Sequence, residues 1–204
     1  MKQLDIQFSD GELQPIVDYC NSEQQYSPVI TKYNKKENWK AISIKGFSQD
    51  PLVISKPNVL GVGSGGNLQE TPLVDRLQIR SILEKIPAMT ERVRLMKLEA
   101  GTKISKHTDK VDKEIKQGKI VRLHVPLRTN NNVYFYLWEG KKEHCFHLDV
   151  GKYYYVDVTA AHAVHNKADM DRLHLVVDCY NNPRLENLLK QAEEFDDISS
   201  PIGF

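Results

Sequence analysis

Residues 120–138, IVRLHVPLRTNNNVYFYLW, carry the clearest structural signal in this chain of 204 residues. Two runs rich in β-branched and aromatic side chains flank three consecutive asparagines, a residue type that favours turns. The same pattern continues on both sides, in RVRLMKL (92–98), KISKH (103–107), HCFHLDV (144–150), KYYYVDV (152–158), AHAVH (161–165) and RLHLVVDCY (172–180). Closely spaced strands with turn residues between them predict a mostly β fold, an antiparallel sandwich or barrel.

Helical patterns flank these strands. A short helix is predicted over residues 10–25, and a last helix over residues 182–194, where Asn-Pro forms a good start. Another helix is predicted over residues 71–86, because its Thr-Pro start supplies a cap and a first-turn proline. Residues 38–47 alternate apolar and polar side chains and predict an additional strand. Helices before and after the strands predict that they cover the outside of one sheet.

The length predicts a single domain, with residues 1–90 as N-terminal support, 91–180 as the β core and 181–204 as a C-terminal helix and tail. The formal net charge is only +1, so nothing points to a nucleic acid or an anionic membrane as a partner. No apolar run is long enough to span a bilayer, and the N-terminus does not resemble a signal peptide. Three cysteines without a CxxC pair argue against disulfides and structural zinc, and predict a reducing, cytoplasmic location.

A candidate metal site begins with His107 and Asp109, which are two positions apart. Residues i and i+2 of a strand project to the same side, so one imidazole and one carboxylate can reach the same ion. His162 or His165 would supply a third ligand. Two histidines and one carboxylate leave three positions of an octahedron open, as in non-haem Fe(II) oxygenases. An HxD pair alone is a weak motif, but all seven histidines lie between residues 107 and 174.

Arg172 is a candidate partner for an organic acid at this site. It follows the segment NKADMD, which we expect to form a hairpin turn that brings Arg172 into the same cavity as His162. A guanidinium there is a two-pronged partner for a carboxylate. The alternative is an ion pair within the protein, with Asp157 or Asp178. The alternation in RLHLVVD predicts a strand with both faces buried.

Three stretches together resemble the aspartyl/asparaginyl β-hydroxylase family of Fe(II)/2-oxoglutarate oxygenases: RVRLMKLEAGTKISKHTD, VRLHVPL and HAVHNKADMDRLHLVVD. That family includes bacterial hydroxylases of free amino acids, among them proline hydroxylases. The resemblance covers about residues 90–180 and rests on a glycine turn before HxD, an RxH strand, and HxVxN followed by RxHLVxD. It implies a double-stranded β-helix, which is a jelly-roll, cupin-like fold. It also implies Fe(II), 2-oxoglutarate and O₂ as cofactors and co-substrates.

By position, the resemblance implies that His107, Asp109 and His162 bind the iron and form the catalytic set. His165 stands where other members often have an aromatic residue, which leaves it as the alternative second histidine. Matching positions also imply residues around 2-oxoglutarate. These are Arg172, for the far carboxylate of 2-oxoglutarate, and the RxH pair Arg122 and His124.

The activity expected from this resemblance is hydroxylation of an unactivated C–H bond. A single domain without an appended recognition module favours a small molecule such as a free amino acid. Arg94 is a candidate for binding its carboxylate, the alternative being ion pairs with Glu91 or Glu99. Two other functions stay open: hydroxylation of an Asp or Asn side chain in a protein or peptide, and a cupin-like metalloprotein that uses no 2-oxoglutarate. The predicted loop GVGSGG (61–66) is interpreted either as a lid or as a plain connector; the sequence predicts no oligomeric state.

Overall fold

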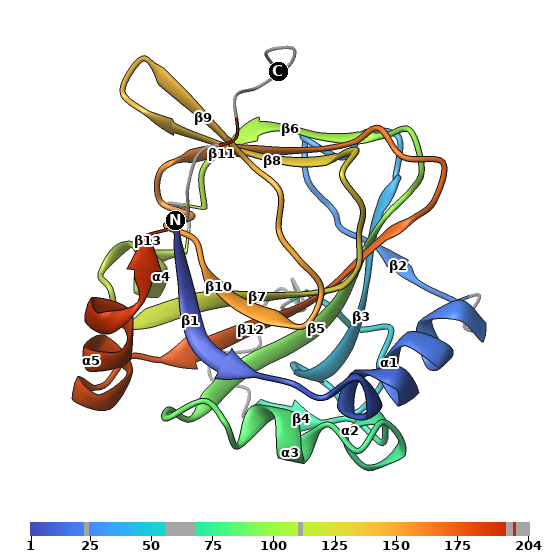
Figure 1. Ribbon diagram of the computed structural model, residues 1–204. Helices are drawn as coiled ribbons and strands as arrows, with labels where there is room; N and C mark the ends of the chain where they lie inside the picture. The colour runs from blue at the N-terminus through green and yellow to red at the C-terminus, as the bar shows by residue number, and fades with distance from the viewer. Residues whose placement is uncertain (23–24, 56–67, 110–111, 195–197, 199–204) are drawn as a thin grey trace, which may run out of the picture.

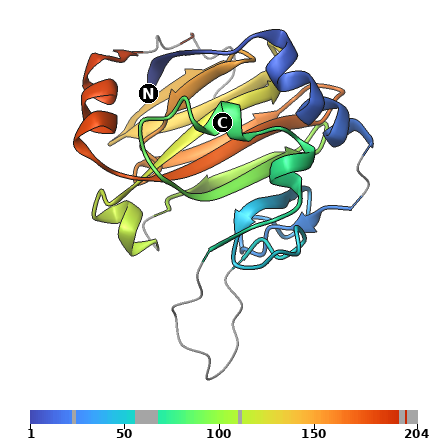
Figure 2. The ribbon, with the colours of Figure 1, turned by 90° about the horizontal axis from the view of Figure 1, so that it is seen from below.

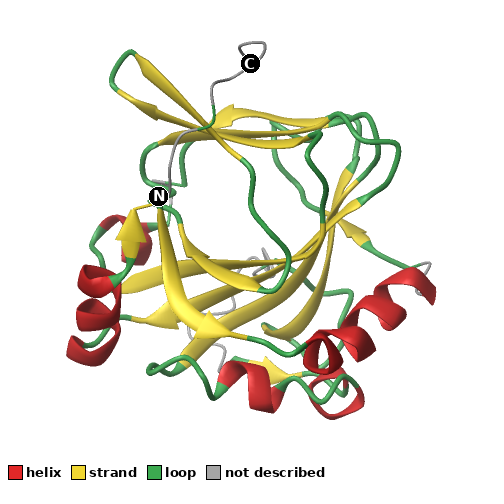
Figure 3. Cartoon of the chain, in the orientation of Figure 1, coloured by secondary structure: helices red, strands yellow, loops and turns green. Residues whose placement is uncertain are grey.

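Two antiparallel sheets face each other across a shared interior (Figures 1 and 3). This arrangement comes from a computed structural model, which describes residues 1–22, 25–55, 68–109, 112–194 and 198. The GVGSGG segment and most of the C-terminal tail lie outside the described residues.

Among the described residues, the larger sheet has nine strands and the smaller sheet has four. The order in the larger sheet is β13 (Glu193–Glu194), β1 (Lys2–Gln7), β10 (Lys152–Tyr155), β7 (Ile120–Arg128), β12 (Arg172–Tyr180), β5 (Thr90–Leu98), β3 (Trp39–Gly46) and β2 (Ser27–Pro28), with β4 (Gln69–Glu70) also paired to β3. The order in the smaller sheet is β6 (Lys103–His107), β11 (Ala161–Asn166), β8 (Val133–Glu139) and β9 (Lys142–Phe146). All the strand runs expected from the sequence are therefore present, with shifted bounds in β9 and β10.

Helices cover the outer face and one end of the larger sheet, as expected. They are α1 (Asp10–Ser22), α2 (Leu73–Arg76), α3 (Arg80–Leu83), α4 (Lys113–Lys116) and α5 (Pro183–Gln191). Figure 2 shows α1 lying across the strands of the larger sheet. None of the described helices is long and apolar enough to cross a membrane. Cys20, Cys145 and Cys179 are all buried, and they form no disulfide with one another.

The strand β12 is buried on both faces, as its alternation predicts. Leu173, Leu175 and Val177 pack into the core that the larger sheet forms with the helices. Arg172 and His174 project to the opposite face, into the interior between the two sheets. Apolar side chains from both sheets fill much of that interior. A polar site can therefore lie inside the molecule without interrupting the outer core.

The expectation of one continuous helix over residues 71–86 was wrong. Two short helices, α2 and α3, are separated by Gln78, whose φ is 52°. A continuous α-helix turns about 100° per residue, so Leu77 and Ile79 would lie on nearly opposite sides of it. The break at Gln78 allows both side chains to be buried, with exposed fractions of 1% and 0%.

The expected hairpin between His162 and Arg172 is not formed either. The strand β11 pairs with β6 and β8, whereas β12 pairs with β5 and β7 in the other sheet. The segment NKADMD thus crosses between sheets. Asn166 braces the crossing, because its buried side-chain amide donates to the carbonyls of Leu98, Glu99 and Met170 at 3.1, 3.2 and 2.9 Å. Arg172 consequently faces His162 from the opposite sheet.

The two ends of the chain also differ from expectation. The helix α5 begins as predicted, with the Asn182 side chain accepting hydrogen bonds from two backbone N–H groups. It ends at Gln191 rather than near Glu194, because Glu193 and Glu194 pair with β1 as the short strand β13. The sequence reasoning missed β1 itself, whose Leu4 and Ile6 are buried.

Candidate metal centre

Three side chains from the smaller sheet converge on one point. His107 ends β6 and is the direct cross-strand partner of His162 on β11. Asp109 follows β6, and its backbone N–H donates to the carbonyl of Val158 at 2.9 Å, which fixes the turn. One ligand atom from each of His107, Asp109 and His162 lies within 4.8 Å of the other two. Within the described residues, these three form the group of His, Cys, Asp or Glu side chains placed to share a metal ion.

Hydrogen bonds orient both imidazole rings. Nδ1 of His107 is 2.7 Å from the carbonyl oxygen of Ser105, and Nδ1 of His162 is 3.0 Å from that of Ala160. A carbonyl only accepts, so each Nδ1 carries a proton and Nε2 is the nitrogen of each ring that can bind a metal. Burial, and then the neighbouring His107, lower the pKa of His162 to about 4, so this ring is neutral near pH 7. Both features suit metal binding through Nε2.

The carboxylate of Asp109 is divided between two environments. Its Oδ1 lies 3.7 Å from Nε2 of His107, on the side of the two imidazoles. Its Oδ2 accepts a hydrogen bond from Nη1 of Arg122. Two imidazoles and one carboxylate oxygen form a donor set that fits Fe(II) and similar divalent metals. The chemistry of the residues present therefore agrees with an iron site.

His165, the alternative ligand, lies on the other side of the same strand. It pairs with Lys103, whereas His162 pairs with His107. Because side chains alternate along a strand, the three-residue offset places His162 inside and His165 outside the space between the sheets. The cluster therefore contains His162 and not His165.

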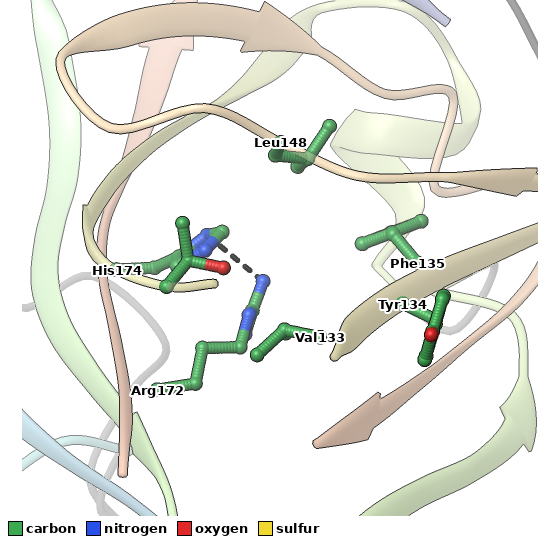
Figure 4. A pocket seen from close by; sticks show the side chains of 7 residues that line it. Val133, Tyr134, Phe135, Leu148, Arg172 and His174 are labelled. Atoms are coloured by element: carbon green, nitrogen blue, oxygen red, sulfur yellow. Dashed lines mark hydrogen bonds between the residues drawn. The ribbon is translucent and has the colours of Figure 1, made fainter. Parts of the chain in front are cut away.

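Arg172 faces the same interior from the larger sheet. Only 5% of it is exposed, and its Nη2 lies 2.8 Å from Nδ1 of His174 (Figure 4). Among the described residues no carboxylate pairs with it, and neither Asp157 nor Asp178 is its partner. Burial lowers the pKa of the Arg172 guanidinium to about 9. A buried arginine without an acidic partner is rare, because its charge needs compensation.

The guanidinium of Arg172 borders a small cavity between the sheets. Val133, Phe135 and Leu148 form its apolar wall (Figure 4). Its volume is about 10 Å³, room for a single water-sized group. The cavity therefore marks a narrow end of the interior that both apolar and polar side chains line and that one cation borders.

His124 on β7 is a buried polar group whose ring nitrogens have no partner among the described residues. Both of its ring nitrogens are buried, and neither makes a hydrogen bond among the described residues. Its ring centroid is 6.1 Å from that of His174, and the charges of Arg172 and His162 both act on it. Burial holds the pKa of His124 well below its ordinary value. Buried polar atoms are nearly always satisfied, so this imidazole indicates a position for a ligand.

A comparison with known families agrees with this site. The family model described as aspartyl/asparaginyl beta-hydroxylase matches residues 11–182. The chain belongs to the aspartyl/asparaginyl β-hydroxylase family. It is thus an Fe(II)/2-oxoglutarate-dependent oxygenase, and the resemblance drawn from the sequence is confirmed. No curated protein matches the chain significantly.

Solved structures show the fold of this aspartyl/asparaginyl β-hydroxylase family member. An oxidoreductase of the 2OG-Fe(II) oxygenase family from Burkholderia pseudomallei has a TM-score of 0.56 at 15% identity, over 85% of this chain and 79% of that one. A prolyl-4-hydroxylase from Pseudomonas putida has a TM-score of 0.50 at 12% identity, over 88% of this chain and 92% of that one. The predicted mostly β, double-stranded β-helix fold is confirmed.

Arg94 of this hydroxylase family member lies inside the molecule rather than at its surface. Its Nη2 donates to Oδ2 of Asp178 at 2.9 Å, while its buried Nε has no hydrogen-bond partner among the described residues. Glu91 pairs instead with Arg92, and Glu99 with Lys40. The ion pairs considered for Arg94 from the sequence are therefore not the ones it makes.

Two aromatic side chains beside the metal centre were not predicted. The Tyr33 ring lies 5.1 Å from the His107 ring, and the Trp39 ring 6.1 Å from it, between centroids. Trp39 also packs against the apolar group of Ala41, Met96 and Val176. In the sequence these residues carry no motif. Trp39 reaches the site through the pairing of β3 with β5, where it is the partner of Leu98, and Tyr33 precedes β3.

Proposed function

We propose that this enzyme hydroxylates a C–H bond of a free amino acid or a similar small carboxylic acid. In this proposal His107, Asp109 and His162 hold the iron. Arg172 binds the far carboxylate of 2-oxoglutarate, with His124 beside it. When bound, iron, 2-oxoglutarate and O₂ together supply the oxidation that converts C–H to C–OH and yields succinate and CO₂.

The observation that carries the proposal is the buried charge of Arg172. It lies in the same interior as the three-ligand cluster and has no acidic partner among the described residues. A carboxylate that reaches this guanidinium compensates its charge and makes two-pronged hydrogen bonds. His124, on which the charges of both Arg172 and His162 act, adds a buried imidazole with two nitrogens that make no hydrogen bond among the described residues. A metal position and a separate buried cation in one interior fit an elongated dicarboxylate that has one end at the metal and the other at Arg172.

Other residues orient the proposed metal ligands and shield the site from water. Carbonyl partners hold each imidazole with Nε2 toward the metal position, and Arg122 holds one oxygen of Asp109. The two sheets surround the site with apolar side chains, among them Phe135 and Val164. Exclusion of water strengthens the ionic contacts inside and limits unproductive oxidation.

The substrate proposal rests on the surroundings of Arg94. Its guanidinium has a buried Nε without a partner among the described residues, so it can still donate to a substrate carboxylate. The apolar group of Ala41, Met96 and Val176 adjoins it, because Val176 and Arg94 are cross-strand partners. One cation beside a small apolar surface fits a free amino acid with an apolar side chain.

The direct test is succinate formation by protein reconstituted anaerobically with Fe(II) and 2-oxoglutarate and then exposed to O₂. His107→Ala and His162→Ala are expected to lose activity and to bind Mn(II) much more weakly than the parent. His165→Ala is the matched control, since this histidine lies on the outer face of the same strand and should leave both measurements unchanged. Parental activity in either His107→Ala or His162→Ala would refute the proposed metal site.

A substrate screen separates the possibilities within the enzyme class. The free amino acids and a set of Asp- and Asn-containing peptides are supplied in parallel, and substrate-dependent succinate is measured together with the mass of the product. We expect a gain of one oxygen atom in a free amino acid. Hydroxylation of peptides alone would refute the small-molecule part of the proposal and leave the oxygenase assignment intact.

A further inference from the structure

Asp178 is the central anion of a buried ion-pair cluster. It lies on β12 with an exposed fraction of 0%. Its Oδ2 is 2.9 Å from Nη2 of Arg94 and 3.1 Å from Nη2 of Arg92. Burial alone would raise the pKa of this carboxyl, but the charges of Arg122 and Arg94 outweigh burial and hold the pKa below its ordinary value. Asp178 is therefore ionised at neutral pH.

Arg122 connects this buried anion to the metal centre. Its Nε and Nη2 donate to the two oxygens of Asp178 at 2.6 and 3.0 Å, a two-pronged contact. The remaining nitrogen, Nη1, donates to Oδ2 of Asp109. Arg122 and Asp178 are direct cross-strand partners on β7 and β12, so the sheet itself fixes their spacing. The planar guanidinium cannot turn toward Asp109 or away from it without losing Asp178.

The consequence for Asp109 is a defined orientation. Its backbone is held by the hydrogen bond to Val158, and its Oδ2 by Arg122. Oδ1 is left facing His107, at 3.7 Å from Nε2. Hydrogen bonds to a ligating carboxylate commonly decide which of its oxygens is available and in what direction it points.

We propose that Asp178 is a positioning residue, which through Arg122 holds the Asp109 carboxylate with Oδ1 toward the two histidines and so preforms the metal site. This inference rests on the proposed function, because it takes Asp109 as a metal ligand. Asp178 touches neither the metal position nor Asp109, and its effect passes through a single guanidinium.

The test compares Mn(II) binding by the full-length parent and by Asp178→Asn, measured by the electron paramagnetic resonance of free Mn(II) and by calorimetry. Asparagine keeps the shape of the side chain but removes its charge and one of its acceptors. We expect the dissociation constant for Mn(II) to rise about 10- to 100-fold, the usual effect of losing a partner behind a metal ligand.

Arg92→Gln is the matched control. Arg92 contacts the same Oδ2 of Asp178 but not Asp109, so its loss disturbs the cluster without releasing the metal ligand. We expect its Mn(II) affinity to stay within about twofold of the parent, even though its thermal midpoint falls. A fall in Mn(II) affinity as large in Arg92→Gln as in Asp178→Asn would indicate a general structural role and overturn the inference.

A second variant keeps the test decisive if Asp178→Asn does not fold. Arg122→Lys retains the positive charge but can reach only one of the two carboxylates, and it should weaken Mn(II) binding about 10-fold or more. Parent-like affinity in a folded Asp178→Asn or Arg122→Lys protein would overturn the positioning role alone. Absence of Mn(II) binding by the parent would instead overturn the metal site of the proposed function, and this inference with it.

Discussion

Replacing Arg172 by methionine is expected to stabilise the protein without ligand and to remove most of its affinity for 2-oxoglutarate. Burial lowers the pKa of the Arg172 guanidinium to about 9, well below the ordinary value of an exposed arginine. At about 1.4 kcal/mol per pH unit, burying this charge destabilises the fold by about 5 kcal/mol. Because the folded pKa lies below the unfolded one, the penalty is present in full at pH 7 and would decline only above pH 9.

Methionine retains the apolar stem but leaves Nδ1 of His174 without its donor, which costs about 1–3 kcal/mol. The net gain in the free energy of unfolding is then about 2–4 kcal/mol. At about 2–4 °C per kcal/mol for a chain of this size, the thermal midpoint rises by about 4–16 °C. Loss of a charge-assisted, two-pronged contact of about 1.5–3 kcal/mol should weaken 2-oxoglutarate binding about 10- to 150-fold.

Differential scanning fluorimetry with Mn(II), with and without 2-oxoglutarate, measures both effects, and calorimetry gives the affinity. Arg128→Met is the control, because Arg128 donates to the carbonyl of Asp171 and to Asn21 instead of facing the cavity. It should lower the thermal midpoint and leave the response to 2-oxoglutarate unchanged. The reasoning is refuted if Arg172→Met unfolds at a lower temperature than the parent and still binds 2-oxoglutarate with parental affinity.

Two further variants test the substrate side and the crossing between sheets. Arg94→Gln should raise the KM for a carboxylate substrate about 10- to 100-fold with a smaller change in kcat, because a charge-assisted contact is lost. Steady-state kinetics on the preferred substrate measure both constants. An unchanged KM would contradict the proposed role of Arg94 in substrate binding. Asn166→Ala should lower the free energy of unfolding by about 3–5 kcal/mol, because the buried amide of Asn166 donates hydrogen bonds to three carbonyls. Urea denaturation measures this change, and Asn187→Ala, at an exposed position, is the control. Equal stability of the two variants would contradict the prediction.

The strands were predictable because their signal is local, whereas their partners were not. Alternating apolar side chains and turn residues identify β7 and β8 from the sequence alone. NKADMD carries the turn residues of a hairpin, yet its two flanking strands pair with β8 and β7, which precede it in the chain. A local turn signal does not distinguish a hairpin from a crossing between sheets, because strand pairing depends on residues distant in sequence. The strand β1, which pairs with β10, was missed although Leu4 and Ile6 alternate with polar residues.

In the candidate site, too, some features follow from local sequence and others depend on how distant segments pair. The spacing of His107 and Asp109 predicts that they share a side, and the structure places them together. The choice between His162 and His165 depends on the register of β11 against β6, which the sequence does not give directly. The family resemblance favoured His162 by matching the position of this residue. The contact of Arg122 with Asp109 and Asp178 depends on how β7, β12 and the turn after β6 meet. No local sequence pattern indicates that these three segments lie together. The role of Arg122 beside 2-oxoglutarate, which the resemblance implied, stays a prediction.

The buried charges explain why this arrangement is suited to a ligand rather than to stability alone. Asp178 is surrounded by arginines that neutralise it, so the charge of this carboxylate is compensated without any ligand. Arg172, on the same strand, has only the neutral side chain of His174. Isolated buried charges are destabilising unless something compensates them, and proteins retain such violations chiefly where a ligand supplies the missing partner. The same strand thus carries one charge that the protein compensates and one that it does not. We propose that the first, on Asp178, orients the metal ligand, and that the second, on Arg172, binds 2-oxoglutarate.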